Sequence, residues 1–186
     1  VQAVLDQLQK LRAKPLETLT PEQARQQPSP ADAATAAAIA QGLDGLPESV
    51  GDVQDRSFAG PVGSLALRLY WPKNAQVGDQ GLPVVLYIHG GGWVIAHKQV
   101  YDGGARGLSK QANAVVVSID YRQAPDHKFP AAWDDALAAY KWTLANAASF
   151  KGDPKKLALA GESAGGNLAV ATIDGHDAAT ITVGQG

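Results

Sequence analysis

The sequence contains no cysteine, no methionine and no long apolar run. Without cysteine the chain forms no disulfide and offers no thiolate to a metal ion, and its redox compartment stays open. Apolar runs such as Val84–Ile88 are far shorter than a membrane-spanning helix, so we expect no membrane span. The missing initiator methionine indicates processing or an excerpt of a longer protein, and no leader-like segment remains at Val1.

A strong excess of charge of one sign is also lacking. Lysine and arginine number 16 and acidic residues 18, which gives a formal net charge of −2. This balance provides no field that would attract nucleic acid or an anionic membrane, so we expect neither as a partner. The 186 residues, 45% of them apolar, suit one domain with a sizeable core. The composition fits a soluble protein, either cytoplasmic or exported with its leader removed, and it does not separate the two.

Residues 1–45 are predicted to be helical. Apolar residues recur with a helical period from Val1 to Leu11. Helix-start signals follow at Thr20 and Ser29, each with a proline next and a capping partner three residues on, and Gly42 is expected to end the last helix. These helices carry few large apolar residues, so we expect them to lie as a cap on the rest of the chain.

Residues 46–186 are predicted to form the core of the molecule. Runs with strand character alternate with helical runs, and three of the strands are apolar on both faces, as in parallel strands that helices cover. We therefore predict an α/β fold with a mostly parallel sheet and helices on both faces. The predicted strands are Val53–Phe58, Leu65–Leu69, Val84–Ile88, Ala114–Ile119 and Leu157–Ala160, and the predicted helices are Tyr101–Ala112 and Pro130–Asn146.

The strongest chemical signal is the G-x-S-x-G pattern at Gly161–Gly165. It follows an apolar strand and precedes a helix start, which is the context of a nucleophile elbow. A serine on such a turn exposes its hydroxyl, and the helix N-terminus behind Ser163 favours negative charge near it. The alternative is a glycine-rich turn with an incidental serine, and the strand–helix context makes this the weaker interpretation.

A second signal, His89–Trp93, reads HGGGW and directly follows a predicted strand. Its glycines expose backbone N–H groups of the kind that bind the oxyanion of an acyl-transfer intermediate. The alternatives are a flexible loop or a phosphate cradle, but no Gly-Lys-Ser/Thr follows and the G-x-G-x-x-G spacing is absent. We interpret His89 as a residue that orients this loop, and not as a general base.

Three motifs occur in order at His89–Trp93, Tyr121–Ala132 and Gly161–Ala169. Together they resemble the bacterial hormone-sensitive-lipase family of esterases, over about residue 1 to Thr172. The resemblance implies an α/β-hydrolase fold with a helical cap built partly from the N-terminus. It also implies hydrolysis of short- and medium-chain carboxylic esters of small molecules, without a cofactor or a metal.

The resemblance also implies roles for single residues. Ser163 corresponds to the nucleophile, and the N–H groups of Gly91, Gly92 and Ala164 correspond to the oxyanion hole. Four further residues are expected to line the substrate pocket, namely His89, Gly90, Trp93 and Glu162.

Two positions depart from the family pattern. Glu162 stands where the family often has Asp, and because an acid is kept we expect little change. Gln123 stands where Leu is common, which we interpret as a difference in a surface loop.

The catalytic acid and base are not evident. In this fold they follow the nucleophile, yet only 23 residues follow Ser163, and these include Asp174, His176 and Asp177. If a helix follows the serine, His176 lies about 20 Å from it, whereas a base must come within about 3 Å. We therefore expect His176 to lie at a solvated helix end, with Gly175 as its C-cap.

The remaining histidines precede the nucleophile, and we expect His97 and His127, like His89, to be structural or solvent-facing. After Thr172 the sequence leaves the family pattern, although Thr180–Val183 has strand propensity. A truncated, frameshifted or partial chain would show such a departure from the family pattern. We therefore expect the chain to be only weakly active as an esterase.

Three functions therefore compete: a serine carboxylesterase, a non-catalytic hydrolase-like module that binds a small ligand, and an inactive fragment. With the C-terminal part of the fold missing, Leu157–Ala160 would lie at or near a sheet edge, and an exposed apolar edge invites self-association.

Overall fold

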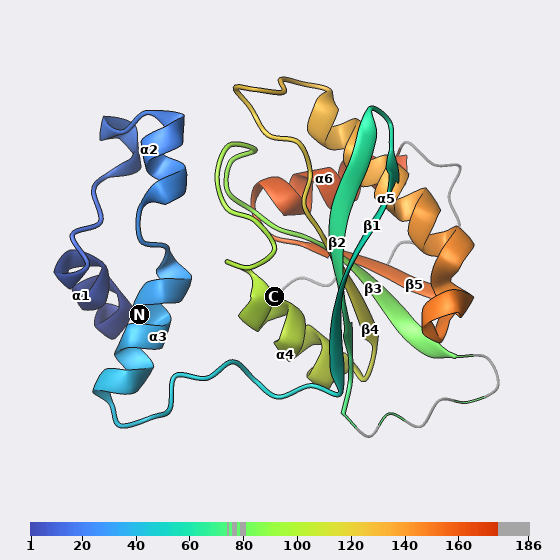
Figure 1. Cartoon of the computed structure of the whole chain (residues 1–186), viewed down its shortest axis with the longest axis horizontal. Coiled ribbons are helices and arrows are strands. Elements are labelled where there is room, and N and C mark those ends of the chain that lie inside the picture. The colour runs from blue at the N-terminus through green and yellow to red at the C-terminus, as the bar shows by residue number, and fades with distance from the viewer. Residues whose placement is uncertain (74, 76–77, 79–80, 175–186) are drawn as a thin grey trace.

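The computed structural model describes residues 1–73, 75, 78 and 81–174 (Figure 1). Five strands and six α-helices are described, with two short 3₁₀ turns. In chain order these elements are α1 (Gln2–Lys10), η1 (Leu16–Thr18), α2 (Pro21–Gln26), α3 (Pro30–Ala40), β1 (Asp52–Gly60), β2 (Gly63–Trp71), β3 (Leu82–Ile88), α4 (Asp102–Ala112), β4 (Val115–Ile119), α5 (Ala131–Asn146), η2 (Ala147–Phe150), β5 (Gly152–Gly161) and α6 (Ala164–Asp174).

The described strands form one sheet in the order β1-β2-β4-β3-β5. Strand β3 pairs in parallel with β4 and β5, whereas β2 is antiparallel to β1 and to β4. Among these strands, therefore, only β2 runs against the common direction. The α/β fold with a mostly parallel sheet is confirmed.

Helices cover both faces of the sheet, as predicted. Alternate side chains of β3 point to opposite faces because a strand has a two-residue period. Val84, Leu86 and Ile88 pack in a core with α5 and α6, whereas Val85 and Tyr87 pack in a second core with α4. Complete burial of each such aliphatic side chain contributes about 1.5–3 kcal/mol, so β3 anchors the loop that follows it.

The N-terminal helices begin where the sequence predicts. The Thr20 and Ser29 side chains each accept the backbone N–H three residues on, which closes two capping boxes. The C-cap of α3 is Gln41, one residue before the expected Gly42, and Gly42 follows it with φ of 81°. Figure 1 shows α1, α2 and α3 beside the sheet and joined to β1 by an extended segment.

Strand β5 lies at one end of the described sheet. Among the described strands it pairs only with β3. None of the side chains of Leu157–Ala160 is fully buried, although the sequence is apolar on both faces. Within the part of the chain that the structure describes, no helix combines the length and the apolar character needed to cross a bilayer.

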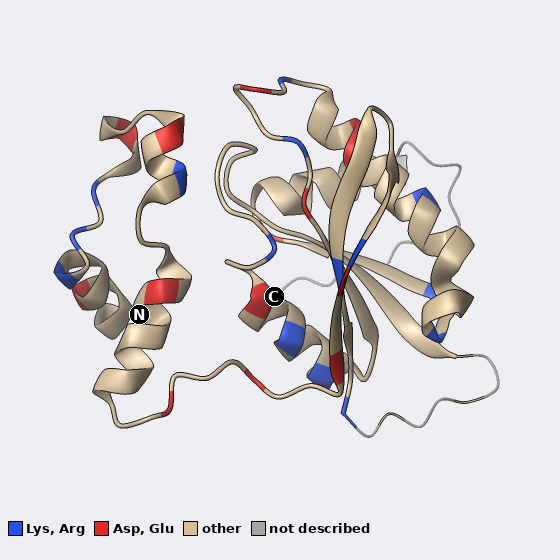
Figure 2. Cartoon of the chain, in the orientation of Figure 1, with Lys and Arg blue, Asp and Glu red and all other residues tan. Residues whose placement is uncertain are grey.

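Charged side chains of both signs are mixed along the chain (Figure 2). At the junction of the extended segment, β2 and α4, one carboxylate joins several partners. Asp102 accepts hydrogen bonds from the Arg106 Nε at 2.6 Å, the Tyr70 hydroxyl at 2.8 Å and the Arg68 Nη1 at 3.3 Å. Lys110 on the same helix pairs with Glu48 of the extended segment. This network fixes the segment that leads from the N-terminal helices into β1.

Candidate active site

Ser163 lies on the sharp turn between the end of β5 and the start of α6. Its φ is 53°, in the left-handed region that a residue with a Cβ rarely adopts, and its side chain is exposed. Such a backbone conformation costs of the order of 1–3 kcal/mol and persists only where the surroundings impose it. The structure therefore has the strand–turn–helix geometry that the G-x-S-x-G pattern predicts.

The two glycines of this motif allow the close approach that imposes the turn. A Cβ added at Gly161 would lie 2.3 Å from the carbonyl oxygen of Gly165. A Cβ added at Gly165 would lie 2.0 Å from the carbonyl oxygen of Ile88 and 2.5 Å from that of His89. The start of α6 therefore lies directly against the end of β3.

We call residues 89–98 the glycine loop. Gly91 and Gly92 have φ of 113° and 61°, and the carbonyl of Gly91 accepts the N–H groups of Val94 and Ile95. A Cβ added at Gly90 would lie 3.4 Å from the Cβ of Ser163. The glycine loop and the serine turn are thus in contact, as the two motifs predict.

Three backbone N–H groups of the two motifs have no acceptor among the described residues. Among the hydrogen bonds of the described residues, none is donated by the N–H of Gly91, Gly92 or Ala164. Gly92 is exposed, and Ala164 opens α6, where the first N–H groups of a helix have no intrahelical partner. These groups are free to donate to a ligand oxygen.

His89 is buried at the start of the glycine loop. Its ring stacks on Tyr121 with the ring centroids 4.4 Å apart, and its Nδ1 lies 2.7 Å from the carbonyl oxygen of Gly90. The Tyr121 hydroxyl donates to the carbonyl of His89 at 3.0 Å. Burial lowers the pKa of His89 because it disfavours the charged imidazolium. These contacts hold the first turn of the loop in place.

Glu162 and Trp93 are both exposed, Glu162 directly before the serine in sequence and Trp93 in the glycine loop. The Tyr101 hydroxyl donates to the Glu162 Oε1 at 2.9 Å. Burial first, and then this hydrogen bond to a carboxylate, raise the pKa of Tyr101 to about 12, so the phenol stays a donor. Trp93, with φ of 60°, leaves 41% of its surface exposed beside the loop.

A cleft of about 820 Å³ separates the N-terminal helices from the glycine loop. Gly91, Ile95, Tyr101 and Glu162 line its core side, and the segment 13–16 is part of its opposite wall. Ser163 itself is not among the lining residues, although Glu162, its direct neighbour, is. The cleft therefore opens next to the serine turn.

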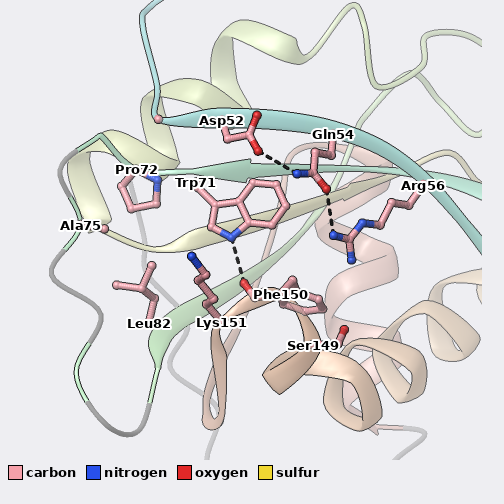
Figure 3. A pocket seen from close by; sticks show the side chains of 11 residues that line it. Asp52, Gln54, Arg56, Trp71, Pro72, Ala75, Leu82, Ser149, Phe150 and Lys151 are labelled. Atoms are coloured by element: carbon pink, nitrogen blue, oxygen red, sulfur yellow. Dashed lines mark hydrogen bonds between the residues drawn. The ribbon is translucent and has the colours of Figure 1, made fainter.

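A second cavity, of about 400 Å³, lies at the other end of β3, where Leu82 contributes to its lining (Figure 3). The Trp71 indole N–H donates to the carbonyl of Phe150 at 2.9 Å, and the Arg56 Nη2 donates to the Gln54 Oε1 at 2.8 Å; both hydrogen bonds are drawn in Figure 3. None of the residues lining this cavity comes from the three motifs.

No described histidine bonds to the serine hydroxyl. His97 is exposed and its Nδ1 lies 2.7 Å from the Gln99 Oε1, and His127 is exposed in the segment before α5. Within the described residues no hydrogen bond involves the Oγ of Ser163. The expectations for Gly175, His176, Asp177 and the strand Thr180–Val183 lie outside the described residues.

Sequence reasoning missed several residues that hold the site. The interpretation of Gln123 as a surface-loop difference is wrong, because its half-buried side chain donates to the carbonyls of Ile95 and Ala96, both at 2.9 Å. Lys98 is buried and its Nζ donates to Asp120 at 2.6 Å. Neither residue lies in a recognisable pattern, since the partners are 27 and 22 positions apart.

Comparison with known proteins identifies the family. A family model described as alpha/beta hydrolase fold matches residues 85–181. The chain belongs to the α/β-hydrolase family. The predicted resemblance to hormone-sensitive-lipase-like esterases is confirmed by the relatives of this α/β hydrolase.

Among curated relatives, the carboxylesterase NlhH of Mycobacterium tuberculosis is 48% identical over 104 residues, 56% of this chain and 32% of that protein. The esterase LipI of the same organism is 44% identical over 118 residues, 63% of this chain and 36% of that protein. Each alignment spans about a third of the relative.

Solved structures show the same relationship. An ester-hydrolase from the metagenome of Lake Arreo aligns with a TM-score of 0.75 at 34% identity, covering 94% of this chain and 52% of that chain. An esterase from Pyrobaculum calidifontis aligns with a TM-score of 0.74 at 35% identity, covering 90% and 50%. The chain spans about half the length of these esterases.

Proposed function

We propose that this α/β hydrolase is a serine carboxylesterase of short- to medium-chain esters, in which Ser163 is acylated. The observation that carries the proposal is the left-handed Ser163 on a strand–helix turn in contact with a glycine loop. Relatives described as a carboxylesterase and as esterases support it.

In the proposed reaction the Ser163 Oγ attacks the ester carbonyl carbon, the bond from that carbon to the alcohol oxygen breaks, and the alcohol leaves with the proton that serine has lost. Water then hydrolyses the acyl-enzyme to the carboxylic acid and the free serine. The N–H groups of Gly91, Gly92 and Ala164 donate to the carbonyl oxygen as it gains negative charge. Ala164 also places the positive end of the α6 dipole beside that oxygen. The serine proton needs an acceptor, which no described histidine provides.

We further propose that residues 1–45 form a cap over residues 46–186 and that the substrate enters between them. The cleft is lined from both sides, and its volume of about 820 Å³ is in the range of small-molecule sites. Of the four predicted pocket residues, Glu162 lines the cleft, whereas His89, Gly90 and Trp93 do not. His89 and Gly90 would act by positioning the glycine loop, and Trp93 would border the reacting ester from that loop.

We also propose that the outer edge of β5 supports self-association. Its backbone N–H and C=O groups have no partner strand on that side within the described sheet, and such an edge pairs readily with another chain. Sedimentation at increasing concentration tests this, and a monomer at all concentrations would contradict it.

The test of the proposed activity is to trap the acyl-enzyme. The protein is incubated with p-nitrophenyl butyrate, quenched in acid, digested and mapped by mass spectrometry. We expect a butyryl ester on Ser163, and none on the exposed Ser57 or in Ser163→Ala. An unmodified Ser163 would overturn the proposal. If Ser163 stayed unmodified while p-nitrophenyl butyrate still slowed hydrogen exchange of the residues that line the cleft, the protein would be a ligand-binding module.

A further inference from the structure

The glycine loop is held from outside by three donors. The carbonyl of Trp93 accepts the N–H of Ala124 at 2.9 Å, and the carbonyl of Val94 accepts the Arg25 Nε at 2.8 Å. The next two carbonyls, of residues 95 and 96, both accept the side-chain amide of Gln123. Four consecutive carbonyls are thus bonded to groups that lie outside the loop.

Arg25 reaches the loop from helix α2. Its three donor nitrogens each have a different partner: Nε donates to Val94, Nη2 to the carbonyl of Ala124 at 2.7 Å and Nη1 to the Asp126 carboxylate at 2.7 Å. Only the planar guanidinium presents donors in a fixed fork of this kind. One side chain of the N-terminal helices therefore joins the glycine loop to the segment that follows β4.

These bonds act on a strained part of the loop. Trp93 and Ala96 have φ of 60° and 67°, a conformation that surrounding contacts must impose. A Cβ added at Gly91 would lie 2.1 Å from the carbonyl oxygen of Ile95, so the two peptides are packed against each other. A shift of the Ile95 carbonyl would therefore move the N–H groups at Gly91 and Gly92.

We propose that Arg25 and Gln123 are positioning residues that fix the glycine loop in the geometry needed for its N–H groups to bind the acyl oxygen. Through Arg25, this geometry depends on helix α2 being docked. The link to acyl transfer rests on the proposed function, whereas the fixing of the loop does not.

The hydrogen bonds from Arg25 to backbone carbonyls, and not its ion pair with Asp126, hold the glycine loop in place. The Asp126 side chain is 61% exposed, and exposed ion pairs contribute little because water and salt screen them. Asp126 also lies outside the glycine loop. Lysine at position 25 would keep the charge, but its single ammonium cannot reach Val94, Ala124 and Asp126 in three directions at once.

Hydrogen exchange of the glycine loop, followed by mass spectrometry, tests the proposal on the full 186-residue protein. Arg25→Gln and Arg25→Lys are compared with Asp126→Asn, which removes only the ion pair, and with Arg12→Gln, an exposed arginine of the same N-terminal segment. We expect exchange in peptides covering residues 89–98 to rise about tenfold in both Arg25 variants. The two control variants and the β3 peptides should match the wild type.

Two outcomes would overturn the proposal. One is wild-type exchange of the glycine loop in Arg25→Lys, and the other is exchange in Asp126→Asn that is as fast as in Arg25→Gln. Either result would mean that the positive charge at position 25 holds the loop, and not the hydrogen bonds to the carbonyls. Gln123→Leu provides a second, independent variant, because it removes both donors to Ile95 and Ala96 while keeping the volume similar. It should also raise exchange in the loop, and unchanged exchange would exclude Gln123 from the proposed role.

The link to catalysis is read from the rate of Ser163 acylation at several ester concentrations. We expect Arg25→Lys to lower the maximal acylation rate about tenfold with little change in the half-saturating concentration. If Arg25→Lys changed only the half-saturating ester concentration, Arg25 would shape the cleft without positioning the N–H groups of the glycine loop, and the proposed link to acyl transfer would be wrong. If wild-type Ser163 is not acylated, the proposed function fails, while the exchange result still decides whether Arg25 and Gln123 fix the loop.

Discussion

At the scale of the residue, the site depends on positions where the backbone has a positive φ or where a side chain has no room. Ser163, Gly91 and Gly92 all have positive φ, and Gly161 and Gly165 each lie where a Cβ would overlap a carbonyl oxygen. The G-x-S-x-G and HGGG motifs predicted these positions because only glycine permits such close approach. The geometry of the site is therefore encoded mainly in the glycines around the serine.

The first prediction concerns Gly165. Gly165→Ala should destabilise the protein by about 3 kcal/mol or more, because its Cβ would overlap the carbonyls of Ile88 and His89, which are fixed backbone. Gly103→Ala is the matched control: Gly103 lies in α4 with nothing within 4 Å of an added Cβ. It should stabilise by up to about 1 kcal/mol. Urea unfolding measures both, and equal effects would contradict the packing at Gly165.

The second prediction concerns His89. Burial holds its pKa in the folded protein below the value of about 6.5 expected in the unfolded chain. Between these two pKa values the unfolded state binds more protons, so stability is complete above about pH 6.5 and falls as the pH is lowered further.

His89→Asn should therefore lose less stability between pH 7.5 and 5.5 than the wild type does. Gln9→Asn, at an exposed side chain that does not titrate, serves as the control and should keep the wild-type dependence. Urea unfolding at the two pH values measures the difference. An identical loss in the wild type and His89→Asn would show that this imidazole does not titrate with folding.

At the scale of the element, the starts of helices and the alternation of strands were predictable, whereas the contacts between elements were not. The capping residues Thr20 and Ser29 act on their own helices, so local sequence reveals them. Gln123 and Asp135 act on partners that only the fold brings near. Asp135 is an ordinary helix residue in sequence, yet it is completely buried.

The third prediction belongs to this scale. Asp135 of α5 accepts the side chain of Arg122 at 2.7 Å and its backbone N–H at 2.9 Å, which ties the segment after β4 to α5. Arg122→Gln should cost about 3–5 kcal/mol because it leaves a buried carboxylate without its cation. Arg12→Gln should change stability by less than about 0.5 kcal/mol. Thermal unfolding measures both, and a small effect at Arg122 would contradict a structural ion pair.

At the scale of the whole molecule, two groups of elements meet at one cleft. The sheet brings the ends of β3 and β5 together, and so places the glycine loop against the serine turn. The N-terminal helices line the opposite wall and contribute Arg25 to the loop. The sequence predicted the motifs and the cap helices separately, but the arginine that connects them carries no local signal because its partners are 69 to 101 positions away.

We expect this fold to make Ser163 more reactive than every other serine of the chain. Competitive labelling with a p-nitrophenyl alkylphosphonate, with each serine quantified by peptide mapping over time, measures this difference. Ser163 is exposed, as are Ser57 and Ser64, which serve as internal references. An oxyanion hole and binding site alone accelerate serine chemistry about 10³–10⁴-fold over water.

We expect Ser163 to react at least about 100-fold faster than either reference serine, with one adduct per chain. Ser163→Ala should leave only the slow background labelling. Similar rates at all three serines, or a Ser163→Ala variant that still forms the fast adduct, would contradict it.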